Sequence, residues 1–183
     1  QYVEHRLTLW ASEKLKRPVK WTCERSEAIQ ADEHGRDVVF EAELALDVDH
    51  NFIGFRASST NNVGAYISSM RNIQAGFGNI GGIVGVYDIP AAYVAVTGAM
   101  TNTNSTAPYR GAGRPEASYV IERLIDEAAR EIHIDPAELR RQNFILPEDL
   151  PYQTSLVFNY DSGDFTTVME KALAMSDYAG FAG

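Results

Sequence analysis

Residues 38–49 alternate between apolar and charged side chains, and this alternation constrains the fold more than any other feature of the chain. The positions between the apolar residues are rich in glutamate and aspartate. Successive side chains of a β-strand point to opposite faces of a sheet, so one face of this strand is covered and the other meets water. Such one-sided covering favours antiparallel pairing. The apolar face consists of Val38, Phe40, Ala42, Leu44, Leu46 and Val48.

Turn residues follow this strand and predict a hairpin. The tripeptide "DHN" (49–51) suits a turn, and "FIGFRASST" (52–60) can return beside the first strand. Residues 91–100, "AAYVAVTGAM", predict another strand. A further strand is expected at "VKWTC" (19–23), where Cys23 would be a buried, inert thiol.

Helical periodicity dominates the second half of the chain. The stripe begins at Pro115, which suits a first helical position, and Glu116 complements the positive end of the helix dipole. A stripe of this kind must pack against another element. Its apolar residues are Ala117, Val120, Ile121, Leu124, Ile125, Ala128 and Ala129.

Three further helices are expected. One covers residues 3–16 and ends before Pro18. Asp135 caps a second helix, with Glu138 at the capping-box position, and Asp164 caps a third. Strands first and helices later indicate the α+β class, with mostly antiparallel strands in the first half and helices from the second half packed on them.

Composition excludes several classes of function. The formal net charge is −9, and a nucleic acid partner would need a basic face. The four histidines show no spacing typical of a zinc site, so no metal ligands are expected. No apolar run approaches the roughly 18–20 residues that cross a bilayer, so no membrane span is expected.

The stretch "GFGNIGG" (76–82) matches the pattern G-x-G-x-x-G at Gly76, Gly78 and Gly81. A dinucleotide-binding turn needs a buried strand before it and a helix after it. The flanking stretches "SSMRNIQA" and "IVGVYDIP" provide neither. We therefore expect a glycine-rich surface loop here.

Two glycines and two arginines precede the strongest helix, in "APYRGAGRPEA" (107–117). Gly111 and Gly113 permit a close approach to the backbone, and amide N–H groups at a helix start are unpaired. Arg110 and Arg114 add forked donors suited to a carboxylate, a phosphate or a metal oxo group. The residues leave two interpretations open: an anion-recognising loop, or a tight turn whose arginines pair with surface carboxylates.

A longer stretch around this loop, "TAPYRGAGRPEASYVIERLIDEAAREIHIDPAELRRQNF", resembles the molybdenum-binding subunit of the xanthine dehydrogenase/aldehyde oxidase family. The branch it resembles most includes the large subunit of aerobic carbon monoxide dehydrogenase. The resemblance extends in order over the whole chain. Its other pieces are "RPVKWTCERSEAIQ", "RDVVFEAELALDVDHNFIGFRA", "NNVGAY", "VYDIPAAYVAV" and "NYDSGDFTTVMEKAL".

The resemblance implies an oxidoreductase that hydroxylates an aldehyde, an N-heterocycle or a similar carbon, with water as the oxygen source. The implied cofactor is molybdenum on molybdopterin cytosine dinucleotide, and electrons would leave through 2Fe-2S clusters and FAD on partner subunits. Matched residue by residue, Arg110, Gly111 and Gly113 would contact the cofactor. Ala112 would line the substrate pocket, and Arg114 is an additional candidate anion contact.

Two departures from the family limit the implied substrate. Carbon monoxide dehydrogenase carries a copper-binding cysteine at the position of Gly111, and glycine offers no ligand to soft Cu(I). Copper-dependent oxidation of carbon monoxide is therefore not expected. Xanthine-oxidising members carry an aromatic residue at the position of Ala112, and alanine leaves room for a bulkier or non-planar substrate.

The chain is expected to be a single fragment, 1–183, of the molybdenum cofactor-binding domain, with a strand-rich part (18–100), a loop (101–115) and a helix-rich part (116–183). The family's glycine–phenylalanine loop would precede Gln1 and its catalytic glutamate would follow Gly183, so the fragment by itself should be inactive and bind no cofactor. The longer protein should be a cytoplasmic oligomer. The alternative is a non-catalytic scaffold or binding module in which the Gly–Arg loop is only a structural turn.

Overall fold

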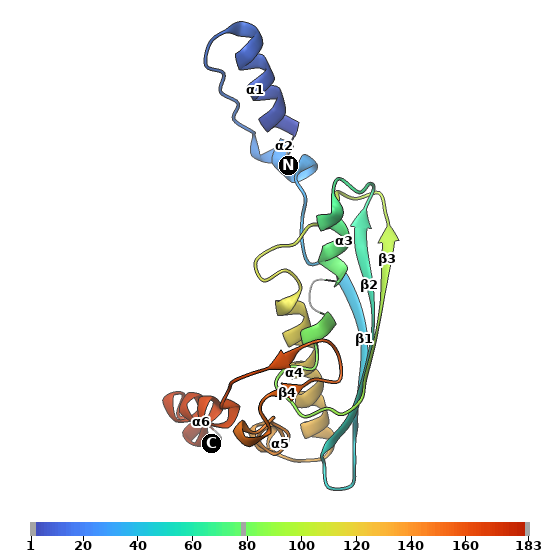
Figure 1. Ribbon diagram of the computed structural model, residues 1–183, viewed down its shortest axis with the longest axis vertical. Helices are drawn as coiled ribbons and strands as arrows, with labels where there is room; N and C mark the ends of the chain where they lie inside the picture. The colour runs from blue at the N-terminus through green and yellow to red at the C-terminus, as the bar shows by residue number, and fades with distance from the viewer. Residues whose placement is uncertain (1–2, 78–79, 182–183) are drawn as a thin grey trace.

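The computed structural model describes residues 3–77 and 80–181 and confirms the α+β class. A long twisted sheet forms the middle of the molecule, helices cover one of its faces, and a helical arm projects from one end (Figure 1). The elements are α1 (Val3–Leu15), α2 (Arg25–Ala31), β1 (Val38–Leu46), β2 (Phe52–Gly64), α3 (Met70–Phe77), η1 (Ile80–Gly82), β3 (Ala92–Met100), α4 (Arg114–Glu131), α5 (Pro136–Gln142), η2 (Pro147–Asp149), β4 (Tyr152–Gln153), β5 (Asn159–Tyr160), α6 (Phe165–Met175) and α7 (Tyr178–Phe181).

β1 and β2 form the predicted antiparallel hairpin. The Asp47 carboxylate accepts hydrogen bonds from the backbone N–H groups of Asp49 and Asn51, both at 2.9 Å, and so shapes the turn. The strand ends at Leu46. Val48, which the alternation assigned to the apolar face, therefore lies in the turn and is 92% exposed, so that part of the prediction is wrong.

β3 pairs with β2 in parallel, a pairing that the one-sided alternation of β1 did not predict. Parallel neighbours need a crossover connection, and residues 65–91 supply it. Because a crossover passes over one face of its sheet, the apolar side chains of this stretch become part of the core. These buried residues are Ile83, Val84, Tyr87 and Ile89.

The expected glycine-rich surface loop at 76–82 is wrong for the residues that the structure describes. Gly76 lies inside α3, and Gly81 lies in η1 and is buried. A Cβ atom on Gly81 would stand 3.0 Å from the Cβ of Val157, so a side chain there would require Val157 to move by a few tenths of an ångström. Gly78 lies outside the described residues. A helix rather than a strand precedes these glycines, so the context of a dinucleotide-binding turn is not met.

α4 packs on β1 with the predicted apolar stripe. The stripe joins aromatic residues from other elements: the Tyr87 ring meets Phe52 edge-on at 5.7 Å and stacks on Phe144 at 5.5 Å between ring centroids. Aromatic pairs at such distances add to the free energy gained by burial alone. The fully covered residues of the helix are Ala117, Ile121, Ile125 and Ala129.

Both predicted helix caps are present. The Asp135 carboxylate accepts hydrogen bonds from the N–H groups of Ala137 at 2.8 Å and Glu138 at 3.1 Å. The Asp164 carboxylate accepts one from Thr167 at 2.9 Å. The Glu138 side chain pairs with Arg141, which lies one helical turn further on.

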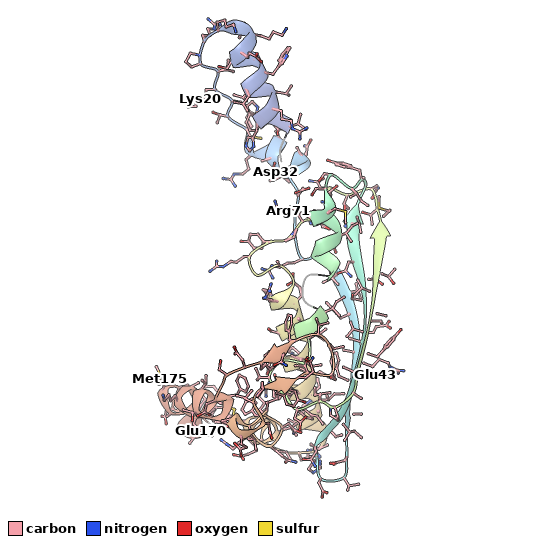
Figure 2. The ribbon with its side chains drawn as sticks, viewed as in Figure 1. Lys20, Asp32, Glu43, Arg71, Glu170 and Met175 are labelled. Atoms are coloured by element: carbon pink, nitrogen blue, oxygen red, sulfur yellow. The ribbon has the colours of Figure 1, made fainter. Side chains whose placement is uncertain are left out.

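The predicted strand at 19–23 is wrong, because these residues form neither a strand nor a helix. They belong to the arm formed by α1 and α2, which projects from the end of the sheet (Figure 2, where Lys20 and Asp32 mark it). A strand needs a neighbour to satisfy its backbone groups, and the sheet lies elsewhere. Cys23 is accordingly only half-buried, and its thiol donates a hydrogen bond to the carbonyl of Glu24 at 3.3 Å.

Candidate cofactor-facing loop

Three consecutive residues of the Gly–Arg loop adopt left-handed backbone conformations. Their φ angles are 98° at Gly111, 49° at Ala112 and 91° at Gly113. Glycine adopts such angles freely, whereas alanine does so at a cost of about 1–3 kcal/mol. Two tight hydrogen bonds hold the bend: Ala112 N–H donates to the Tyr109 carbonyl at 2.8 Å, and Arg114 N–H donates to the Gly111 carbonyl at 3.1 Å.

Gly111 is required by packing as well as by its backbone angle. A Cβ atom at this position would stand 2.6 Å from Cδ and 2.8 Å from Cγ of Pro115, closer than real Cβ contacts. Pro115 is held as the second residue of α4. This loop therefore cannot accept a cysteine at 111 without moving.

The two arginines of the loop are both exposed. An Arg114 Nη atom lies 3.4 Å from the Gly111 carbonyl, so that side chain folds back on its own loop. Within residues 3–77 and 80–181, no hydrogen bond or ion pair joins the Arg110 guanidinium to another residue. The Arg110 guanidinium is therefore available to bind an acceptor outside the described residues. Burial of this side chain would have ruled out such binding, and the side chain is exposed.

Backbone donors gather beside Arg110. Among the described residues, the N–H groups of Arg110, Gly111 and Gly113 donate to no other group. The loop leads directly into the N-terminus of α4, where the helix dipole favours negative charge. In Figure 1 the connection between the end of β3 and the start of α4 includes this loop. Residues 110–114 thus bring unpaired backbone N–H groups and two guanidinium groups together in a short segment.

A segment that the sequence analysis missed holds this loop. Residues 34–37 run beside it and are called the 34–37 strap below. His34 N–H donates to the Ser105 carbonyl at 3.1 Å, and Ala107 N–H donates to the His34 carbonyl at 2.8 Å. Gly35 packs so tightly that an added Cβ would lie 2.8 Å from the Cβ of Tyr109. The tripeptide "HGR" before a long strand was the available signal, but its partner is about seventy residues away in the sequence.

Arg36 makes three contacts with the loop and the helix start. One guanidinium nitrogen donates to the Arg110 carbonyl at 2.6 Å, and another lies 3.3 Å from the Glu116 carboxylate. The guanidinium carbon also lies 5.1 Å from the centroid of the Tyr109 ring, within cation–π range. Arg36 itself has a φ of 62°, so its backbone is as unusual as that of the loop it holds.

A polar network around the buried side chain of Asn72 supports the 34–37 strap. Asn72, which is 1% exposed, donates to the Thr106 carbonyl at 2.6 Å and to the Glu33 carboxylate at 3.0 Å. Ser68 also donates to Glu33. Burial is the strongest influence on the Glu33 carboxyl and acts to raise its pKa, but these hydrogen bonds hold the pKa below its ordinary value. The carboxylate therefore remains charged at the junction.

A small cavity of about 40 Å³ lies under the loop. Arg110 and Ala112 do not line it. Its walls come from the sheet, the crossover and the start of α4. They include Phe40, Ser59, Ile83, Val94, Thr106 and Glu116.

The described residues hold no cluster of three or more histidine, cysteine, aspartate or glutamate side chains that could bind a metal ion. None of the helices in the described ranges is long and apolar enough to cross a membrane. The loop therefore offers hydrogen-bond donors rather than metal ligands.

The bend at the start of α4 of this α+β fold carries hydrogen-bond donors of the kind that suit an anionic or oxygen-bearing group. A model of the molybdopterin cofactor-binding domain matches residues 1–144, and the chain belongs to this family, that of the molybdenum-binding subunits of xanthine dehydrogenase-like oxidoreductases.

Three known proteins illustrate the similarity. The carbon monoxide dehydrogenase large chain of Hydrogenophaga pseudoflava is 39% identical over 172 residues, which are 92% of this chain and 21% of that protein. A Cu,Mo-CO dehydrogenase structure superposes with a TM-score of 0.88 at 33% identity, covering 99% of this chain and 23% of that one. Quinoline 2-oxidoreductase from Pseudomonas putida 86 also gives 0.88, at 30% identity, covering 97% and 23%. The chain thus spans less than a quarter of these relatives.

Proposed function

We propose that this chain is part of a molybdenum hydroxylase subunit and that residues 110–113 contact the molybdenum cofactor. One observation carries the proposal: an exposed Arg110 without a partner among the described residues lies next to the free N–H groups of a left-handed glycine loop. The loop lies inside the stretch that matches the cofactor-binding domain. A surface of guanidinium and amide donors suits phosphate oxygens and metal-oxo groups.

The residues present fit such a group. Arg110 would donate through its guanidinium, and Gly111 and Gly113 would donate through their backbone and leave space for a close approach. Arg114 would provide a second positive charge at the edge of the loop. When bound, the cofactor would supply a two-electron redox centre. The fixed donors of the loop would stabilise negative charge that changes during turnover, without needing to reorganise.

The proposed substrate is an aldehyde, an N-heterocycle or a similar carbon. Quinoline 2-oxidoreductase, one of the relatives above, is named for an N-heterocycle. Ala112 would form a shallow wall of the substrate pocket together with parts of the longer protein, and its methyl group leaves room for a non-planar substrate. Because Gly111 has no thiol and no space for one, the copper-dependent oxidation of carbon monoxide is not part of the proposal.

The proposed whole protein has partners. Molybdopterin cytosine dinucleotide would be the form of the cofactor, and electrons would pass to 2Fe-2S clusters and FAD on partner subunits in a cytoplasmic oligomer. The catalytic glutamate would lie outside residues 1–183. The isolated fragment would accordingly bind no molybdenum and oxidise no substrate.

The test uses the full-length gene expressed with its neighbouring subunits. Molybdenum content and reduction of a dye acceptor by aldehydes and N-heterocycles are measured for the unmodified protein, for Arg110→Met and for the control Arg130→Met. Arg130 lies at the opposite end of α4 and is 70% exposed. We expect loss of molybdenum or of at least about 90% of the activity only in Arg110→Met, as is typical when one oxyanion donor is removed.

An unmodified protein without molybdenum and without activity would favour the alternative, a scaffold or binding module in which the Gly–Arg loop is only a turn. Equal activity of Arg110→Met and Arg130→Met would also contradict the proposed contact.

A further inference from the structure

The conformation of the Gly–Arg loop depends on more than its own residues. The carbonyl of Arg110 belongs to the peptide group that also contains the N–H of Gly111. Since a peptide group is planar, a bond that holds its oxygen also sets the direction of its N–H. That oxygen accepts a hydrogen bond from Arg36 at 2.6 Å. Arg36 thus acts on a donor that faces the proposed cofactor.

Arg36 is itself held on two sides. Glu116 lies 3.3 Å from one of its nitrogens, and the Tyr109 ring lies under its guanidinium at 5.1 Å. The side chains of Arg36 and Glu116 are 32% and 19% exposed, so the carboxylate is mostly covered and the guanidinium is partly accessible to water. The buried Oε2 of Glu116 makes no hydrogen bond within the described residues, so the ion pair with Arg36 is its main compensation. Loss of Arg36 would leave this carboxylate oxygen without a partner.

We propose that Arg36 is a positioning residue, which orients the Arg110–Gly111 peptide and so aims the donors of the loop. This inference rests on the proposed function. The 34–37 strap transmits the constraint, since His34 and Gly35 fix the strap to residues 105–109 while Arg36 reaches residue 110. Glu116 ties the same guanidinium to the first turn of α4. The loop is therefore clamped between the strap and the helix that it begins.

The experiment compares variants of the full-length protein by hydrogen exchange and by turnover per bound molybdenum. In Arg36→Met, peptides covering residues 105–113 should exchange about tenfold faster, because one charge-assisted hydrogen bond is lost. Peptides from β1 and from residues 121–131 of α4, beyond its first turn, should be unchanged, which shows that the domain remains folded. Turnover per molybdenum should fall by at least about tenfold, while KM changes little.

Two further variants separate positioning from simple structural support. Arg36→Lys retains one donor but not the fork or the stacking, so it should recover part of the turnover and part of the protection. Gly35→Ala changes no charge but pushes against Tyr109, and it should also speed exchange at 105–113. The matched control is Arg56→Met, since Arg56 pairs with Glu43 on the exposed face of the sheet and both side chains are about two-thirds exposed.

The outcomes are distinct. Unchanged exchange in Arg36→Met, or an equal change in Arg56→Met, would overturn the proposal. Faster exchange with normal turnover per molybdenum would overturn the positioning role as well, because Arg36 would then support only the loop's stability. If the unmodified protein contained no molybdenum, the proposed function would fail, and the exchange data would still decide whether Arg36 holds the loop.

Discussion

α1 and α4 are both helices with apolar residues at helical spacing, yet they have opposite environments. α4 buries its stripe against the sheet, and Ile125 within it is completely covered. α1 buries none of its residues: Leu9 is 74% exposed and Trp10 is 58% exposed. Periodicity therefore predicts that a helix forms and which face needs covering. It does not predict what covers that face, because the covering element comes from elsewhere in the chain.

The largest effect should come from the covered helix. Ile125→Ala in the 183-residue chain should lower the free energy of unfolding by about 2–5 kcal/mol, since it removes apolar contacts and leaves a cavity. Urea unfolding followed by circular dichroism measures this. Ile125→Val is the matched control and should cost about 0.5–1.5 kcal/mol. A loss below about 1 kcal/mol for alanine would mean that α4 is not the main covering element.

The polar junction between the arm and the sheet should show the next largest effect. Asn72→Ala should lower the free energy of unfolding by about 1–3 kcal/mol, because Glu33 and the Thr106 carbonyl lose a buried donor. The same urea titration measures the change. Asn102→Ala, at an exposed position of the 101–113 connection, should have almost no effect. Equal effects of the two substitutions would contradict a structural role for the network.

The cap of α5 should contribute less. Asp135→Ala should cost about 1 kcal/mol, the usual value for a lost N-cap. Burial is the strongest influence on this carboxyl and acts to raise its pKa, but hydrogen bonds from Tyr178 and two backbone amides lower the pKa overall. A lowered folded pKa means that the stabilisation is present above about pH 4 and is lost as the pH falls further.

Asp135→Asn keeps the cap but removes the charge. The loss of stability on acidification below about pH 4 should therefore be smaller in Asp135→Asn than in the unmodified chain, as thermal unfolding at several pH values would reveal. Identical pH profiles would show that Asp135 does not contribute to acid unfolding.

The smallest effect should come from the arm. Leu9→Ala should change the free energy of unfolding of the 183-residue chain by less than about 0.5 kcal/mol, because an exposed side chain loses few contacts on truncation. The measurement is the same as for Ile125→Ala. A cost close to that of Ile125→Ala would show that α1 is covered in solution and would remove the contrast between the two helices.

Much of the fold could be predicted because its signals are local. Alternation located β1, the stripe located α4, and the cap residues Asp135 and Asp164 marked the starts of α5 and α6. The prediction of a strand at 19–23 was wrong because a strand depends on a neighbouring strand, which local composition does not show. The prediction of a surface loop at 76–82 was wrong because β2 and β3 pair in parallel. The crossover that connects them includes this stretch and packs against the sheet.

The candidate site was predictable in part for the same reason. The glycines and arginines at 110–114 are adjacent in the sequence, so their pattern is visible there, and their contact with the cofactor stays a prediction. Arg36 and the strap were not predicted. Their contacts with Tyr109 and Arg110 join parts of the chain that are remote in sequence, and no local pattern marks such pairs.

The sequence by itself determined β1, β2, β3, α1, α4, α5 and α6, the caps at Asp135 and Asp164, and the bend of glycines at the start of α4. Backbone sterics and side-chain periodicity, which act over a few residues, are sufficient for these features. Only the tertiary structure decided that β3 pairs in parallel, that α4 is covered and α1 is not, and that Arg36 hydrogen-bonds the carbonyl of Arg110. Those outcomes depend on contacts between remote segments, whose free energy exists only once the chain has folded.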